Sequence, residues 1–216
     1  MSALLRPRGV VFDMDGLLLN TESLRMQALD DCARELGAPV KTDLFAALIG
    51  GATSTARAAL DVHVREELPA DFWAHYRRFA ERRMEAVQPM PGALDLLDHL
   101  VARAIDCAIA TSATRASVER FCGPFGLLER FRVVVAKGDY AASKPAPDAF
   151  LAAAAKLGFA PADCLALEDS YNGVRAAAAA GMATIMAPDV LPATDEMRAL
   201  CVAIVGDLRE VIARLG

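Results

Sequence analysis

The sequence predicts an α/β fold: a parallel-sheet core with a purely helical segment inserted after its first strand. After residue 93, short apolar runs alternate with helical patterns, which is typical of βαβ units. Between residues 22 and 86 no strand pattern occurs, and about 65 residues are enough for a small helical bundle. The predicted core is therefore discontinuous, with residues 1–19 and 87–216 in the core and residues 20–86 in the helical domain.

The composition excludes several classes of protein. The 216 residues are 55% hydrophobic with a mean hydropathy of +0.29, yet no stretch approaches the ~18 apolar residues of a membrane span. No signal-peptide pattern precedes Val10, and a net charge of -5 argues against a nucleic-acid surface. The cysteines form no CxxC pair, so we expect a cytoplasmic protein with reduced, buried thiols. They are Cys32, Cys107, Cys122, Cys164 and Cys201.

The first predicted strand, residues 9–12, ends in two carboxylates. Asp13 and Asp15 follow this apolar run one residue apart, and Gly16 comes next. Buried acids are costly without a counter-charge, which favours a cation or a catalytic role. An Asp-Gly turn that closes a hairpin is the alternative interpretation.

The helical segment is expected to contain four helices. Thr21 is the expected N-cap of the first, and Gly37 is expected to end it. Pro69 is expected to open the last, in which Trp73, Tyr76 and Phe79 follow helical spacing and form the core of the segment. The predicted ranges are 22–36, 43–49, 54–64 and 69–84.

The remaining elements alternate after the linker 89–92. The helix over residues 93–104 is expected to bury Leu94, Leu97, Leu100 and Val101. Another helix should start within residues 144–148, with proline in its first turn, and stop before Gly158. Further helices are predicted over 115–121, 173–180 and up to Leu215. The predicted strands are 105–110, 133–136, 164–167, 183–187 and 202–205.

Three predicted strands end in polar residues, and this convergence is the main indication of a site. In an open parallel sheet the ligand lies outside the carboxyl ends of the strands. If the first strand is central, the three polar ends meet at one edge of the sheet. They are Asp13 and Asp15, Thr111 and Ser112, and Glu168 and Asp169.

The chemistry available at this edge is that of phosphoryl binding. Four acids so close together would become protonated unless a cation neutralised them, and Mg²⁺ prefers oxygen ligands. The absence of nearby His or Cys in the sequence argues against zinc. Lys144 offers a positive charge, and Thr111 and Ser112 offer hydroxyl and backbone N–H groups at a helix start. Asp13 could attack phosphorus, and Asp15 could protonate the leaving oxygen and then activate water.

These residues resemble the haloacid dehalogenase superfamily. The match comprises Asp13-Met14-Asp15-Gly16, Thr111-Ser112, Lys144-Pro145, Glu168-Asp169-Ser170 and Asn172-Gly173-Val174, in order and with fitting spacing. The resemblance implies a Rossmann-like core, a helical cap and Mg²⁺-dependent phosphoryl transfer through an aspartyl phosphate.

By the same resemblance, Asp13 is the nucleophile and Asp15 the general acid/base. The metal ligands would be Asp13, the backbone carbonyl of Asp15, Asp169 and Glu168. Thr111 or Ser112, together with Lys144, would bind the phosphoryl group. The expected partner is a small phosphorylated metabolite, such as a sugar phosphate, and the expected assembly is a monomer or weak dimer.

Within the superfamily, the sequence looks most like the β-phosphoglucomutase-like phosphatases. The mutases carry a cap histidine where this chain has Arg25, and basic residues around a cap-loop glycine where it has Leu48 to Thr53. Simple hydrolysis is therefore favoured over a mutase, and a non-catalytic module is the remaining alternative. Asp15 argues against the dehalogenases, which lack the second Asp.

Two groups of arginines in the cap carry weaker signals. Arg25 could bind substrate because its helix directly follows the site, but a surface role is an equal alternative. The other group comprises Arg77, Arg78, Arg82 and Arg83. Because Glu81 and Glu85 are interleaved with these arginines, we expect a solvated, salt-bridged helix face rather than a surface that steers substrate.

Overall fold

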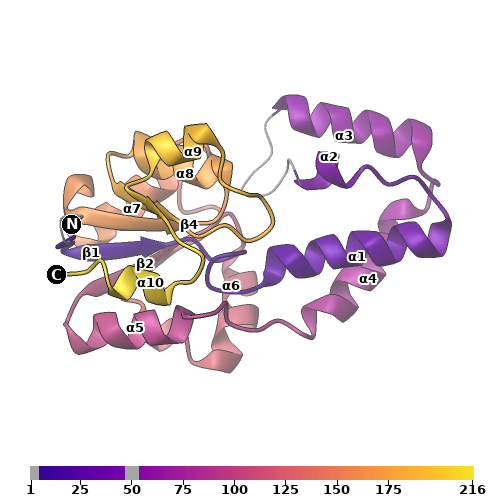
Figure 1. Cartoon of the computed structure of the whole chain (residues 1–216). Helices are drawn as coiled ribbons and strands as arrows, with labels where there is room; N and C mark the ends of the chain where they lie inside the picture. Colours follow the sequence, from indigo (N-terminus) through magenta and orange to yellow (C-terminus); the bar gives the residue numbers. More distant parts are fainter. Residues whose placement is uncertain (1–4, 47–53) are drawn as a thin grey trace.

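A six-stranded parallel sheet forms the core of the computed structural model, which describes residues 5–46 and 54–216 (Figure 1). The strand order is β3-β2-β1-β4-β5-β6, so β1 lies between β2 and β4. The predicted α/β class is therefore confirmed. The strands are β1 (Gly9–Phe12), β2 (Asp106–Ala110), β3 (Val133–Val135), β4 (Cys164–Glu168), β5 (Ala183–Met186) and β6 (Ala203–Ile204).

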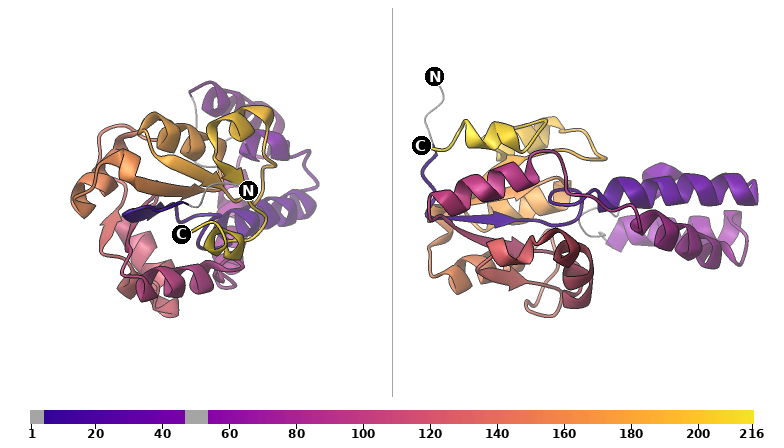
Figure 2. Two further views of the ribbon diagram at one scale, coloured as in Figure 1. Left: turned by 60° about the vertical axis from the view of Figure 1, so that its left-hand side comes forward. Right: turned by 90° about the horizontal axis from the view of Figure 1, so that it is seen from below.

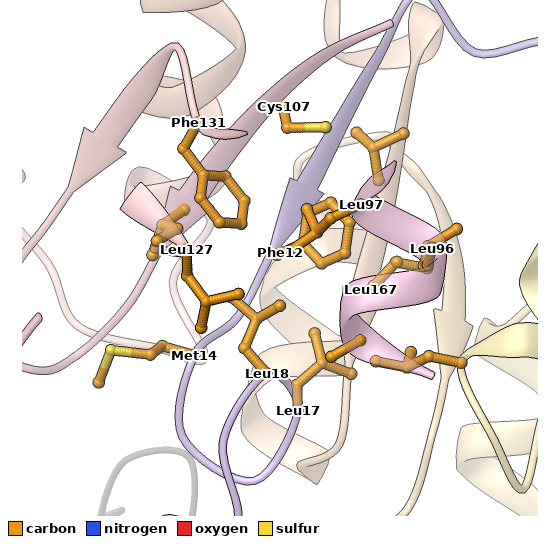
Figure 3. Close-up of a cluster of buried hydrophobic side chains, with 14 of the residues drawn as sticks. Phe12, Met14, Leu17, Leu18, Leu96, Leu97, Cys107, Leu127, Phe131 and Leu167 are labelled. Carbon is orange, nitrogen blue, oxygen red and sulfur yellow. The ribbon is translucent and has the colours of Figure 1, made fainter. Parts of the chain in front are cut away.

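Helices cover both faces of this sheet, which is why β1 reads as a continuous apolar run. Val10 and Phe12 belong to the cluster under α5 (Ala93–Ala102), α6 (Arg115–Cys122) and α10 (Arg209–Ile212). Val11 faces the opposite cluster, under α7 (Asp148–Leu157) and α8 (Tyr171–Ala179), while α9 (Asp195–Leu200) packs against α8. The buried side chains around Phe12 are shown in Figure 3.

Four helices in the described part of the chain between β1 and α5 extend beyond the carboxyl ends of the strands (Figures 1 and 2). They are α1 (Thr21–Leu36), α2 (Thr42–Ala46), α3 (Ser54–Glu67) and α4 (Phe72–Met84). They bury a cluster of their own around Leu29, Phe45 and Phe72. We refer to them as the cap helices. None of the helices in the described ranges is long and apolar enough to cross a membrane.

The two connections between the cap helices and the core run side by side. Asn20 Oδ1 accepts a hydrogen bond from the Gln88 amide at 2.8 Å, and the Met90 amide donates to Leu18 O at 2.9 Å. In addition, Asp189, in the loop after β5, accepts a hydrogen bond from the Ser23 amide in the first turn of α1 at 3.2 Å. These bonds hold the start of α1 over the edge of the sheet.

Several predicted boundaries were wrong in the helical segment. Thr21 is the first residue of α1 and not its N-cap, which is Asn20. Pro69 lies before α4, which begins at Phe72. The helix predicted over 43–49 is described only up to Ala46, and the loop of residues 48–53 lies outside the described residues. The predicted packing of Trp73, Tyr76 and Phe79 is confirmed, since these side chains are partly buried against the cap cluster.

One prediction of packing was wrong. In α5, Leu96 is buried, whereas Leu94 and Val101 are 37% and 54% exposed. The predicted solvated, salt-bridged face of α4 is confirmed for two arginines, but the partners are not Glu81 and Glu85: Arg83 contacts Asp31 at 2.6 Å, and Arg78 contacts Glu35. The partners lie on α1, so these arginines join two cap helices.

The remaining differences concern helix starts in the core. α7 begins at Asp148 with Pro147 as its N-cap, so no proline lies in its first turn. α8 begins at Tyr171, two residues before the prediction, because Ser170 caps it by accepting from the Gly173 amide at 3.1 Å. The helix α9 had no predicted counterpart.

Candidate active site

The polar ends of β1, β2 and β4 meet at one edge of the sheet, as the sequence predicted. Phe12 is level with Ile109 of β2 and Leu167 of β4, and Asp13 continues the ladder by donating its amide to Leu167 O at 3.0 Å. Asp13 and Thr111 line one cavity of about 370 Å³. The topology therefore brings residues about 100 positions apart into one site.

Lys144 lies directly behind Asp13. Its ammonium group donates to Asp13 Oδ1 and, at 2.6 Å, to Glu168 Oε1, and its side chain is 1% exposed. Burial opposes the charged form, but Asp13 and Glu168 more than offset it and raise the pKa of Lys144. Lys144 is therefore a permanent cation shared by two buried carboxylates.

Glu168 is fully engaged within the protein. Besides the contact with Lys144, its Oε2 accepts from the amides of Asp169 and Ser170, both at 3.0 Å, and from the Ser170 hydroxyl at 2.9 Å. A Cβ atom at Gly173 would overlap this carboxylate, so the first turn of α8 can pass here only as glycine. Glu168 thus anchors Lys144 and the loop after β4, and we leave it out of the metal ligands that we propose.

Asp169 has the opposite surroundings. Both carboxylate oxygens are buried, and neither has a hydrogen-bond partner among the described residues. The carboxylate lies against Gly16, whose φ of +81° and lack of a Cβ let the turn after Asp15 pass close to it. A buried carboxylate without a donor is expensive, so Asp169 requires a cation or a proton.

Burial also raises the pKa of these acids. The pKa of Asp13 rises to about 8, because burial and the charges of Glu168 and Asp15 outweigh Lys144. Burial, Glu168 and Asp13 raise the pKa of Asp169 well above its usual range. The pocket therefore holds more negative charge than Lys144 alone can balance.

Asp15 is held from the cap side. Its Oδ1 accepts from the Thr21 hydroxyl at 2.7 Å and contacts Arg25 at 3.2 Å. Arg25 also pairs with Glu22 at 2.9 Å, and burial raises the pKa of Glu22 to about 7 despite this arginine. The sequence-predicted Arg25 therefore lines the cavity and is bound to Asp15.

The opposite wall is the start of α6. The Ser112 hydroxyl is buried without a partner in the described part of the chain, while Thr111 Oγ1 accepts from the Ala113 amide at 3.0 Å. Thr114 caps the helix by accepting from the Ser117 amide at 3.2 Å. A capped helix start with a free hydroxyl suits an anion.

Sequence reasoning missed five residues that line this cavity. They are Glu22, Ala113, Thr114, Ser117 and Lys137. The N-cap position of Thr114 before α6 would have identified it, as would the spacing of Glu22, one turn before Arg25. Lys137 had no local signal, since the turn after β3 brings it here. Conversely, Lys144, Glu168 and Asp169 are buried behind the cavity and do not line it.

The comparisons with known proteins agree with this geometry. A model described as haloacid dehalogenase-like hydrolase matches residues 10–187. The probable pseudouridine-5'-phosphatase of Drosophila melanogaster is 37% identical over 189 residues, 83% of this chain and 80% of its own. The fructose-1-phosphate phosphatase YqaB of Escherichia coli is 32% identical over 180 residues, 82% and 94% of the two chains.

Structural similarity extends over almost the whole chain. CbbY from Rhodobacter sphaeroides in complex with phosphate is 27% identical with a TM-score of 0.74, covering 95% of this chain and 96% of its own. Two of the relatives are much longer: the chain spans 17% of SUPPRESSOR OF QUENCHING 1 from Arabidopsis thaliana, to which it is 37% identical, and 48% of a bifunctional riboflavin kinase/FMN phosphatase from the same organism.

The fold, the paired acids and these relatives define a phosphoric monoester hydrolase with an α/β core. The chain belongs to the haloacid dehalogenase-like hydrolase family.

Proposed function

We propose that this hydrolase cleaves a small phosphorylated metabolite through a phosphoryl group carried on Asp13, with Mg²⁺ as its cofactor. The observation that carries the proposal is the placement of Asp13. This residue opens into a cavity with Asp15, Ser112 and the start of α6, and the buried Lys144 binds it from behind. A nucleophile, an acid/base, an anion-binding wall and a fixed cation are the groups that phosphoryl transfer requires.

The donor atoms fit Mg²⁺. The oxygens of Asp169, which have no partner among the described residues, lie beside the turn that carries Asp15. Burial, together with the neighbouring acids, raises the pKa of Asp13 and Asp169. Among the described residues, no group of three or more Asp, Glu, His or Cys side chains is arranged to hold a metal ion by itself. The ion would therefore depend on few protein ligands. Mg²⁺ accepts one or two carboxylates plus phosphate and water. We assign Asp13, Asp169 and the Asp15 backbone carbonyl as ligands, and the bound ion would neutralise charge on the transferring phosphoryl group.

The proposed reaction has two steps at phosphorus. An Asp13 oxygen forms a bond to phosphorus while the ester P–O bond breaks, and Asp15 gives its proton to the leaving alkoxide. Water then attacks the phosphoryl group on Asp13 and passes a proton to Asp15, which releases inorganic phosphate and regenerates both carboxyl groups. Thr111 and Ser112 bind the phosphoryl oxygens, and Lys144 holds the nucleophile Asp13 in position. This positioning is most of what the reaction requires.

The relatives support a small substrate but differ in which one. Their names specify pseudouridine 5'-phosphate and fructose 1-phosphate. We propose that residues 20–86 act as a cap that closes over the substrate, since Glu22 and Arg25 of α1 line the cavity. The proposed compartment is the cytoplasm, because all five cysteines are free and four are buried. A monomer or weak dimer stays a prediction.

A sugar phosphomutase is the second candidate. The resemblance of the sequence to the β-phosphoglucomutase-like branch is the reason to test it. However, Arg25 stands where the mutases carry their cap histidine, and its ion pair with Asp15 at 3.2 Å gives it a different role. Incubation with glucose 1-phosphate separates the two functions. A phosphatase releases inorganic phosphate, and a mutase forms glucose 6-phosphate instead.

The proposed function is tested by hydrolysis of p-nitrophenyl phosphate. We expect phosphate release with Mg²⁺, none after chelation with EDTA, and recovery when Mg²⁺ is returned. Asp169→Asn should raise the Mg²⁺ concentration required by at least about tenfold, as loss of a ligand or its support does. Asp163→Asn, at the opposite end of β4, is the control and should behave as wild type. Full activity in EDTA would refute the metal assignment.

A further inference from the structure

A second cavity in the cap opens beside the catalytic one. It has a volume of about 280 Å³, and Glu22 and Arg25 line both cavities. Its remaining wall is apolar and aromatic, with Arg57 as the one further charged group among the described residues that line it. We call it the aromatic recess, and its apolar wall consists of Met26, Leu29, Phe45, Trp73 and Tyr76.

The three rings of the aromatic recess form a connected wall. The Trp73 ring lies 6.1 Å from Phe45 and 5.9 Å from Tyr76, and the two contacts are tilted and edge-on. Phe45 is buried, whereas Trp73 and Tyr76 are only half-buried and so keep surface available to a ligand. Three rings around a hollow favour a flat group, because aromatic rings stack on or meet such a group edge to face.

Two polar groups belong to the same wall, the indole N–H of Trp73 and the hydroxyl of Tyr76. Both side chains are only half-buried, so these groups can hydrogen-bond to a ligand that enters the aromatic recess. A ring that carries hydrogen-bonding atoms matches such a wall better than a plain hydrocarbon does.

The chemistry changes in order along the two cavities. The phosphate fits at one end, beside Asp13, Ser112 and the start of α6. The shared wall of the two cavities comes next, with Glu22 and Arg25, and the aromatic recess lies beyond it. Glu22 and Arg25 can bind hydroxyl groups, since one accepts and the other donates hydrogen bonds. A substrate that matches this order has a phosphate, a hydroxylated middle and a planar polar ring.

We propose that the substrate is a nucleoside 5'-monophosphate with a single-ring base, and that this base lies in the aromatic recess; the inference rests on the proposed function. A hexose phosphate matches less well, because hydroxyl groups placed against Met26, Leu29 and Phe45 would lose hydrogen bonds to water without replacement. The volume favours a single ring, since about 280 Å³ is at the lower end of ligand pockets.

The sole tryptophan of the chain is Trp73, so its fluorescence reports directly on the aromatic recess. The test uses the Asp13→Asn variant, which needs no turnover, with uridine 5'-monophosphate and ribose 5-phosphate as probes. Uridine 5'-monophosphate should bind roughly ten- to a hundredfold more tightly, the range for stacking of one base on aromatic side chains, and should change the Trp73 emission saturably. Equal affinities, or binding without a change in emission, would overturn the inference.

A kinetic comparison distinguishes failure of the inference from failure of the proposed function. In wild type, kcat/KM for uridine 5'-monophosphate should exceed that for ribose 5-phosphate at least tenfold, and Tyr76→Leu should bring the ratio toward one. Phe79→Leu, on the same helix but outside the aromatic recess, is the matched control and should keep the ratio. Hydrolysis of both esters at equal rates contradicts only the inference. Hydrolysis of neither, and of no aryl phosphate, contradicts the proposed function.

Discussion

Lys144 and Asp13 are in direct contact although 131 positions separate them in the chain. Both side chains are almost completely buried, and Glu168 shares the lysine at 2.6 Å. The lysine fixes one oxygen of Asp13, and the loop after β4 fixes the lysine through Glu168. Stability and activity therefore depend on the same ion pair, which has consequences for several substitutions.

Lys144→Met should impair both properties. The substitution leaves Asp13 and Glu168 buried without their cation, and breaking such a pair costs about 3–5 kcal/mol. We expect a lower free energy of unfolding in urea and a kcat reduced at least about a hundredfold. The control is Lys156→Met, which removes an exposed lysine and should change stability by less than about 0.5 kcal/mol. A variant as stable as wild type would contradict the shared-cation interpretation.

Gly173→Ala should destabilise the enzyme through Glu168. The added Cβ would overlap the Glu168 carboxylate, so either α8 or Glu168 and its lysine must shift. Overpacking of this kind costs about 1–3 kcal/mol. Gly123→Ala is the matched control, because its φ of -57° is helical and no atom lies within 4 Å of the new Cβ. Thermal unfolding of both variants measures the difference, and equal Tm values would show that Glu168 is not held tightly.

Thr21→Val should affect catalysis more than folding. Valine keeps the shape of threonine but removes the hydrogen bond to Asp15 Oδ1 at 2.7 Å. A hydrogen bond to a charged group is worth about 1.5–3 kcal/mol, so kcat should fall roughly ten- to a hundredfold while KM changes little. Thr21→Ser restores the hydroxyl and should recover most of the activity. Failure of serine to rescue would mean that packing around Thr21, and not orientation of Asp15, is what matters.

The metal-free enzyme should lose stability as pH rises from about 5 to 8. The folded-state pKa is about 8 for Asp13 and about 7 for Glu22, against usual values near 4, so the folded state binds more protons than the unfolded state in this window. Stability therefore falls as these groups are forced to ionise. Acids with lowered pKa, such as Asp31, have already ionised below this window.

Thermal unfolding at several pH values, in EDTA and in Mg²⁺, checks this expectation. The decrease in Tm should be smaller with Mg²⁺, because the cation favours the charged carboxylates. Asp13→Asn removes one of the titrating groups and should flatten the EDTA curve. A Tm that increases with pH in EDTA would contradict the raised folded-state pKa values of Asp13 and Glu22.

The topology of the site could be predicted because strand ends carry it. Asp13 follows a buried strand, and a central first strand brings Thr111 and Asp169 to the same edge by the geometry of parallel sheets. Lys144 was identified for the same reason, as a cation at a loop-to-helix junction. These predictions required only element order, which hydrophobic patterns determine well.

The directions of individual side chains could not be predicted. Glu168 and Asp169 are neighbours in sequence, yet one is saturated with donors and the other has none among the described residues. Periodicity likewise favoured Leu94 over Leu96 in α5, because both lie near the edge of the apolar stripe and the sheet decides between them. The arginines of α4 pair with α1, and such tertiary contacts leave no local pattern.

The central claim is that Asp13 carries the phosphoryl group. The most direct measurement is rapid acid quenching of the wild-type enzyme during turnover of p-nitrophenyl phosphate, followed by mass spectrometry of the peptide that contains Asp13, with phosphate release by Asp13→Asn measured in parallel. We predict a phosphoryl adduct on Asp13 and at least a thousandfold loss of activity in the variant, as for the removal of other covalent nucleophiles. An adduct on another residue, or an Asp13→Asn enzyme that turns over at the wild-type rate, would contradict the account.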